Sequence, residues 1–195
     1  KGEFRAYKVR LEENQPLEFS SLTPQIPAAG WYEREIYDLF GLRPVGHPDL
    51  RPLVLHENWP EGVYPLRKDF VLSAGVEGER RFPMNYVQGE GVFEVPVGPI
   101  HAGIIEPGHF RFSQAGEDII NLDAKLFFTH RGIEKAVEGL TVEQAFYSAE
   151  RICGACTVSH GISYSIAVEK LGKVQISERA QYIRILAAEL ERLYN

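Results

Sequence analysis

The hydrophobic pattern changes its period near Thr129, and this change does most to limit the folds open to the chain. Before it, in EDIINLDAKLFF, polar and apolar residues alternate, which places the apolar set on one face of a β-strand: Ile120, Leu122, Ala124, Leu126 and Phe128. After it, apolar residues recur every three or four positions, as they do in amphipathic helices. The sequence therefore predicts an α+β protein in which an antiparallel sheet precedes the start of a helical bundle.

Composition excludes several classes of protein. A chain of 195 residues, 44% of them hydrophobic, can bury a core. Its 21 Lys and Arg against 27 Asp and Glu give a formal charge of -6, which argues against nucleic acid as a partner. No apolar run approaches the roughly 20 residues of a membrane span, and no signal segment opens the sequence. We expect a soluble, cytoplasmic protein and, because Lys1 stands first, a fragment.

The first 72 residues are predicted to form a small α+β unit. In WYEREIYDLFG the spacing of Tyr32, Ile36, Leu39 and Phe40 gives one helical face, and Gly41 is placed to end that helix. Residues 73–90 are rich in Gly, Glu, Arg and Ser, which is typical of a linker. The second domain is then expected over 91–195.

The second domain is predicted to begin with strands. Two extended runs, 92–100 and 108–112, precede the alternating strand. The short polar segment SQAGED between the last two runs indicates an antiparallel hairpin.

Three helices are expected after the hairpin. Thr141 and Gln144 fit a capping box, so the first should run from there towards Arg151. The second should cover TVSHGISYSIAVEKL and stop at Gly172, and the third should begin near Ser177. The third helix carries an apolar stripe that needs a partner: Ala180, Ile183, Ala187, Leu190 and Tyr194.

The two cysteines form a C-x-x-C pair, Cys153 and Cys156, with His160 four residues later. If this segment is helical, the three side chains share one side, and a helix N-terminus favours the thiolates that bind metal. A buried inert pair remains open, whereas a thioredoxin-like dithiol expects a preceding strand and c-type haem expects C-x-x-C-H. Structural zinc needs four ligands, and the chain holds no second C-x-x-C. Spacing alone therefore permits a metal without naming it.

Longer motifs supply a resemblance. RICGACTVSH, preceded by FFTHRGIEK and VGPIHAGIIEPGHFRF, resembles the amino-terminal part of the large subunit of nickel-iron hydrogenases, in the membrane-bound, energy-converting group related to complex I. EREIYDLFGLRPVGHPDLRPLV, Glu33 to Val54, resembles the signature of the complex I 30-kDa subunit. A fusion of 30-kDa-like and 49-kDa-like parts is the arrangement of formate hydrogenlyase and hydrogenase-4 large subunits.

The resemblance implies a nickel-iron centre whose iron carries carbon monoxide and cyanide. Cys153 would be a terminal nickel ligand and Cys156 would bridge nickel and iron, with two more thiolates from a distant C-x-x-C pair. Soft thiolates suit both metals. His160 would donate to the bridging sulfur, and Glu106 would relay protons.

Further residues are assigned by the same resemblance. His101, His109 and Arg111 lie in a segment that helps to form the quinone cavity in complex I, so they are expected near the proton path or the proximal iron-sulfur cluster of the partner. His130, Arg131 and Glu134 are expected to support the centre. The implied partners are an iron-sulfur small subunit, similar to the 20-kDa subunit of complex I, and membrane-arm subunits.

The resemblance implies reversible reduction of protons to H2 by a complex on the inner face of the cytoplasmic membrane. This chain would not span the membrane and would be inactive alone, because two thiolates cannot hold the centre. One alternative is a complex I-like NADH or ferredoxin:quinone oxidoreductase subunit without nickel. Another is a zinc-stabilised interaction module that uses Cys153, Cys156 and His160. Dinucleotide binding is not expected, because no G-x-G-x-x-G follows a strand.

Overall fold

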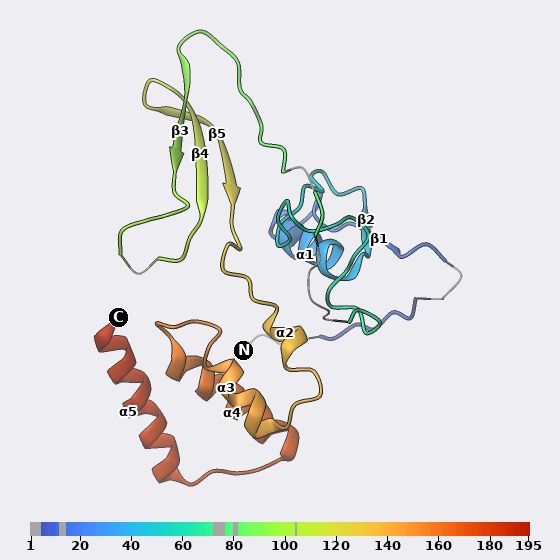
Figure 1. Ribbon diagram of the computed structural model, residues 1–195. Coiled ribbons are helices and arrows are strands. Elements are labelled where there is room, and N and C mark those ends of the chain that lie inside the picture. Colours follow the sequence, from blue (N-terminus) through green and yellow to red (C-terminus); the bar gives the residue numbers. More distant parts are fainter. Residues whose placement is uncertain (1–4, 12–14, 72–76, 80–81, 104) are drawn as a thin grey trace. The chain divides into compact units, whose positions relative to one another are not determined.

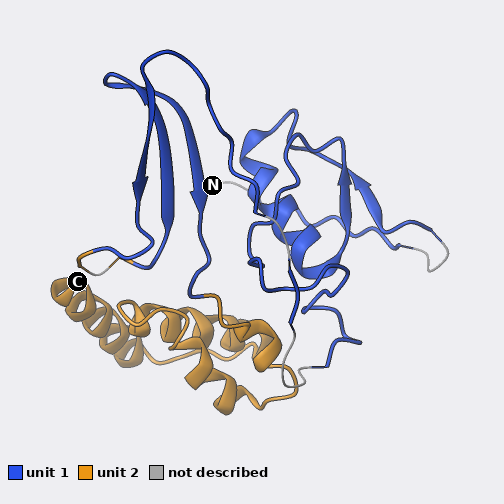
Figure 2. Cartoon of the chain, turned by 45° about the horizontal axis from the view of Figure 1, so that its top comes forward, with its two compact units in different colours: residues 1–101, 106–129 blue, residues 102–105, 130–195 orange. Residues whose placement is uncertain are grey.

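The computed structural model describes residues 5–11, 15–71, 77–79, 82–103 and 105–195, and it has the expected α+β composition. The chain forms two compact units (Figure 2). The first, here called the sheet unit, comprises residues 1–101 and 106–129, and the second, the helical unit, comprises residues 102–105 and 130–195. Part of the expected linker at 73–90 lies outside the described residues.

The sheet unit begins with two short parallel strands and one helix (Figure 1). Strands β1 (Glu18–Ser20) and β2 (Arg43–Val45) pair in parallel, and the 3-10 turn η1 (Pro27–Ala29) leads into helix α1 (Gly30–Phe40). Gly41 ends α1 as predicted, with φ of 73°. Only glycine fits there, because a Cβ would lie 2.5 Å from the ring of Tyr64.

The buried face of α1 differs from the predicted apolar one. Leu39 is buried, but Tyr32 is 70% exposed and Phe40 is also exposed. The other buried side chains of the helix are charged: Glu33, Arg34 and Asp38. The apolar spacing thus predicted the helix correctly, and Leu39 on the apolar face is buried, but the other buried side chains lie outside that face and are held by hydrogen bonds.

Each buried charge of α1 bonds to backbone outside the helix. Asp38 accepts the N–H groups of Leu53, Val54 and Leu55 at 2.8, 2.9 and 3.2 Å. Arg34 donates to the carbonyls of Arg51 and Pro52, the two residues that directly precede Leu53, at 2.8 and 2.9 Å. The three apolar residues that Asp38 holds form the core together with Leu39. Polar bonds therefore place the core segment against α1.

Glu33 braces the other side of α1. Its carboxylate accepts from the Ser21 hydroxyl at 2.6 Å, the Leu22 N–H at 2.6 Å and the Thr23 hydroxyl at 2.7 Å. Burial by itself raises the pKa of Glu33, but these hydrogen bonds, with the nearby His47, outweigh burial and keep the pKa below its ordinary value. The carboxylate is therefore charged at neutral pH.

The second sheet is three-stranded and antiparallel, in the order β3 (Val92–Val97), β4 (His109–Ala115) and β5 (Asp118–Lys125). The predicted hairpin is thus confirmed as β4–β5. Alternation in β5 also holds, but Ile120 and Leu122 are about half exposed, at 51% and 50%. On the opposite face, Asp123 is 2% exposed and Asn121 and Lys125 are partly buried, whereas Ile119 is 58% exposed.

Asp123 ties this sheet to the loop after α1. It accepts from Arg51 at 2.8 Å and from the N–H of Asn85 at 2.6 Å. Arg51 also bonds Asp49 through both carboxylate oxygens, and Asp49 and then Asp123 raise the pKa of this guanidinium. A second ion pair joins Lys125 to Glu57. The charged contacts explain why the sheet belongs to the same compact unit as α1.

The helical unit contains α2 (Ile133–Ala136), α3 (Val142–Ala149), α4 (Thr157–Gly172) and α5 (Glu178–Tyr194). The capping box at Thr141, the stop at Gly172 and the start near Ser177 are confirmed. Tyr164 on α4 bonds the Val142 carbonyl at 3.0 Å and so joins α3 to α4.

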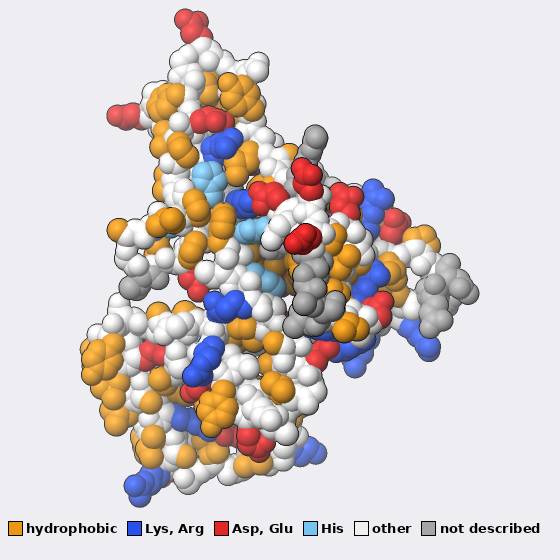
Figure 3. All heavy atoms as spheres, in the orientation of Figure 1, with side chains coloured by type: hydrophobic (Ala, Val, Ile, Leu, Met, Phe, Trp, Pro, Cys, Tyr) orange, Lys and Arg blue, Asp and Glu red, His pale blue; other side chains and the backbone are white. Residues whose placement is uncertain are grey.

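Helix α5 packs antiparallel to α4 through polar side chains. Arg184 bonds Glu169, and Glu191 bonds the first turn of α4. The predicted apolar stripe is largely uncovered: Ile183 is 55% exposed and Tyr194 is 86% exposed. Figure 3 shows hydrophobic side chains gathered on the surface of this unit. No helix among the described residues is long and apolar enough to cross a membrane.

Candidate functional site

The cysteine pair lies in a loop between α3 and α4. A continuous helix from Cys153 to His160 is not formed: α4 begins at Thr157, where the second helix was expected, and Cys156 is its N-cap, with φ of -118° and ψ of 37°. The bend of the loop nevertheless brings the two sulfur atoms within 2.9 Å of each other. The structure has no disulfide between these described cysteines, and both are partly buried. Two adjacent thiols at a helix start can act together as soft metal ligands.

His160 lies one turn into α4. The backbone N–H of His160 donates to the Cys156 carbonyl at 3.1 Å, so the helix fixes the position of His160 relative to the loop. Among the described residues, no group of three or more His, Cys, Asp or Glu side chains is arranged to hold a metal ion. The described chain therefore offers two thiols, which fit half of a four-thiolate set, and it offers no third ligand for a zinc site.

Arg131 supports the cysteine loop directly. It donates to the carbonyls of Arg151 and Ile152 at 2.8 and 3.0 Å. His130 and Glu134 are exposed in the same unit. The structure thus places Arg131 against the residues that lead into Cys153.

The remaining predicted site residues belong to the sheet unit. Glu106 is exposed and accepts from the Thr129 hydroxyl at 2.9 Å. His101 and His109 donate across one loop, to the carbonyls of Gly108 and Gly98 at 2.8 and 3.2 Å. Both imidazoles therefore close the loop that carries Glu106.

Gly98 is required for that closure. Its φ is 76°, and a Cβ there would lie 2.1 Å from the Gly108 carbonyl oxygen. Arg111, on β4, lies 3.7 Å from the Glu94 carboxylate on the adjacent strand. The structure thus groups His101, His109 and Glu106 in one unit and both cysteines, Arg131 and His160 in the other.

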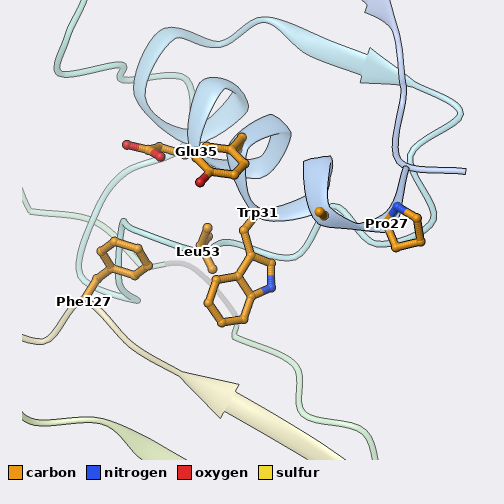
Figure 4. Close-up of a pocket in the computed structure, with 7 residues that line it drawn as sticks. Pro27, Trp31, Glu35, Leu53 and Phe127 are labelled. Carbon is orange, nitrogen blue, oxygen red and sulfur yellow. The ribbon is translucent and has the colours of Figure 1, made fainter. Parts of the chain in front are cut away.

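The sheet unit also has an aromatic groove of about 400 Å³, which was not predicted from the sequence (Figure 4). It is lined by Pro27, Ala28, Trp31, Tyr32, Glu35, Leu53 and Phe127. Trp31 is 53% exposed beside it. The signal in the sequence was the adjacent pair Trp31 and Tyr32 at the start of α1, of which the predicted helical face included only Tyr32.

Two family models match separate segments of the chain. Residues 3–76 match the model described as respiratory-chain NADH dehydrogenase, 30 Kd subunit, and residues 131–195 match the model described as nickel-dependent hydrogenase. The sheet of β3, β4 and β5 lies between the two matches. The cysteine loop falls within the hydrogenase match.

Relatives extend over almost the whole chain. It is 41% identical to formate hydrogenlyase subunit 5 of Escherichia coli (strain K12), over 96% of this chain and 34% of that protein. It is 40% identical to hydrogenase-4 component G of the same organism, over 91% of this chain and 33% of that protein. The chain is thus homologous to about a third of each of these hydrogenase subunits. The resemblance seen in the motifs is therefore confirmed.

The chain is similar to complex I subunits as well. The chain is 32% identical to the NADH-quinone oxidoreductase C/D subunit of Bacteroides fragilis (strain ATCC 25285), over 98% of this chain and 40% of that protein. The chain spans about a third of the length of its hydrogenase relatives. The chain therefore resembles subunits of hydrogenases and of complex I over most of its own length.

Proposed function

We propose that the chain is part of the catalytic large subunit of a membrane-associated nickel-iron hydrogenase, which reduces protons reversibly to H2. The observation that carries the proposal is the pair of adjacent thiols, 2.9 Å apart, inside the segment that matches nickel-dependent hydrogenases. Thiolates are the ligands that nickel and low-valent iron prefer. The geometry supports Cys153 and Cys156 as two of four thiolates.

Each residue has a proposed part in this reaction. Cys153 would bind nickel terminally, and Cys156 would bridge nickel to an iron that carries carbon monoxide and cyanide. The bound centre would supply the change of redox state. His160 would donate towards the Cys156 sulfur and lower its electron density. Glu106 would accept and release a proton at its carboxylate, which suits its exposed position in the closed loop.

The partners follow from the same proposal. Electrons would pass through an iron-sulfur cluster on a small subunit, and His101, His109 and Arg111 would lie towards that cluster or the proton path. Membrane-arm subunits would hold the complex on the inner face of the cytoplasmic membrane. The relatives support this arrangement, since their names describe them as subunits or components.

The competing function is a complex I-like subunit that reduces quinone without nickel. The similarity to the C/D subunit over 98% of the chain favours it. The two cysteines favour the hydrogenase instead, because the complex I 49-kDa pattern lacks cysteine at these positions. Metal content separates the two functions.

The test uses the full-length subunit in its complex. We expect bound nickel, H2 production from a reduced dye, and infrared bands of metal-bound carbon monoxide and cyanide. Cys153→Ser and Cys156→Ser should each abolish all three, whereas Ser163→Ala, at an exposed position on α4, should change none. Quinone reduction by a complex that contains no nickel would establish the alternative.

The isolated chain gives a second test. Residues 1–195 should show no hydrogen-dependent reduction of dye, because they contain two cysteines and therefore half of the thiolates. Activity in this preparation would contradict the proposed four-thiolate centre.

A further inference from the structure

Every backbone carbonyl of the cysteine loop, residues 151–156, lies within hydrogen-bond distance of a donor. Arg131 donates to the first two carbonyls, and the Thr157 hydroxyl lies 3.3 and 3.2 Å from the next two. The side-chain amide of Asn195 donates to Ala155 at 2.8 Å, and the N–H of His160 donates to Cys156. A loop without regular structure is thereby fixed by donors from three separate parts of the helical unit.

The amide groups after the loop are held as well. Among the described contacts at the start of α4, the Cys156 side chain provides no cap. The N–H groups of Val158 and Ser159 instead donate to the two carboxylate oxygens of Glu191 at 2.6 and 2.9 Å. The Ser159 hydroxyl bonds the same carboxylate. Glu191 on α5 thus satisfies the first turn of α4 from 32 residues away.

Glu191 and Asn195 lie four residues apart, so they share one side of α5. One bonds the residues just after Cys156, and the other bonds the residue just before it. The Arg184–Glu169 pair, at the opposite end of α4, joins only side chains and already links the two helices. The two helices are therefore also linked at a place that does not involve the cysteine loop.

We propose that Glu191, assisted by Asn195, is a positioning residue that fixes the spacing of Cys153 and Cys156 for metal binding. This inference rests on the proposed hydrogenase function. A ligand pair in a loop keeps its geometry only when the surrounding backbone is fixed. Substitution of a group that holds a metal ligand in place typically lowers metal affinity by about 10- to 100-fold. The negative charge of Glu191 also complements the positive end of the α4 dipole.

The experiment compares Glu191→Gln with Glu189→Gln in the full-length subunit within its complex. Gln has the shape of Glu but offers one oxygen, so one backbone N–H of α4 would face an amide NH2 group. Glu189 is an exposed carboxylate on the same helix and bonds Arg192, so its substitution is a matched control. Asn195→Ala is a third variant that leaves Glu191 in place.

Two measurements are made on each variant, bound nickel and the rate at which iodoacetamide alkylates the cysteines of the metal-free subunit. For Glu191→Gln we expect roughly tenfold less nickel and severalfold faster alkylation, with unchanged helix content by circular dichroism. Asn195→Ala should change both in the same direction but less, and Glu189→Gln should match the wild type.

Wild-type nickel content and alkylation rate in Glu191→Gln would overturn the positioning role. Lower nickel with equally lowered helix content, and an unaffected Asn195→Ala, would also overturn it, since the role would then be structural. A wild-type complex without nickel would refute the proposed function instead. In that case, faster alkylation in Glu191→Gln would still support the role of Glu191 in fixing the cysteine loop.

Discussion

In both the sheet unit and the helical unit, a helical carboxylate accepts hydrogen bonds from backbone N–H groups of another segment. The carboxylate is more deeply buried in the sheet unit. In the sheet unit, Asp38 bonds three backbone N–H groups and is 2% exposed. In the helical unit, Glu191 bonds two backbone N–H groups, but it is only partly buried. Ala149 and Gly161 are the buried residues of the helical unit among those that the structure describes. A charged helical side chain thus orders a neighbouring loop in both units.

How deeply each carboxylate is buried determines how much free energy of unfolding is lost when it is removed. Removal of a buried acceptor leaves N–H groups that water cannot reach, and each costs about 1–3 kcal/mol. Removal near the surface lets water replace the lost bond, so the cost is smaller. We therefore expect the carboxylates of the sheet unit to control stability and those of the helical unit to control local geometry. Substitutions can test this contrast.

The largest effect is expected for Asp38→Ala. It leaves the N–H groups of Leu53, Val54 and Leu55 without their shared acceptor, so the sheet unit should lose about 3–5 kcal/mol in free energy of unfolding. Both tryptophans of the chain, Trp31 and Trp59, lie in this unit, so urea unfolding followed by tryptophan fluorescence measures it selectively.

The control for Asp38 is Glu35→Ala on the same helix, where the side chain is only partly buried. It should change the free energy of unfolding by less than about 0.5 kcal/mol. Equal losses for Asp38→Ala and Glu35→Ala would show that burial of the carboxylate does not determine the loss in free energy of unfolding.

An intermediate effect is expected for Asp123→Ala. The change removes the acceptor for Arg51 and Asn85, but the Arg51 side chain is 25% exposed and keeps Asp49 as a partner. We expect a loss of about 2 kcal/mol in the same fluorescence experiment, less than for a fully buried pair. Asp118→Ala, at an exposed position of β5, should be close to neutral. A neutral Asp123→Ala would mean that the sheet does not depend on this ion pair.

The smallest effect is expected for Thr141→Ala in the helical unit. It removes the exposed capping box of α3, which typically costs about 1 kcal/mol. Circular dichroism at the helical wavelength should show the loss, while tryptophan fluorescence should not change. Thr141→Ser keeps the cap and should behave like the wild type. A shift of the fluorescence transition would show that the two units unfold together.

Much of the fold could be predicted from local patterns. The helix end at Gly41, the capping box at Thr141 and the β4–β5 hairpin follow from residues close together in sequence. The inward faces could not be predicted in this way. Asp38 and Asp123 can be buried because each accepts hydrogen bonds from a distant segment, 15 residues away for Asp38 and 72 residues away for Asp123. The periodicity of the sequence does not indicate such pairs.

The candidate site shows the same division. C-x-x-C and its flanking motifs predicted the resemblance to hydrogenase subunits, which the relatives confirm. They did not predict that the pair lies in a loop, or that Glu191 and Asn195 hold it. The roles assigned to Glu106, His101, His109, Arg111 and His160 stay predictions.

Local sequence patterns were enough to predict most elements and the resemblance to hydrogenase subunits, because both depend on neighbouring residues and on the motifs that they form. Which faces are buried and which side chains hold the cysteine loop became visible only in the folded chain. The physical reason is that a charged side chain can be buried only where a distant partner satisfies it, and only the folded chain brings that partner into contact.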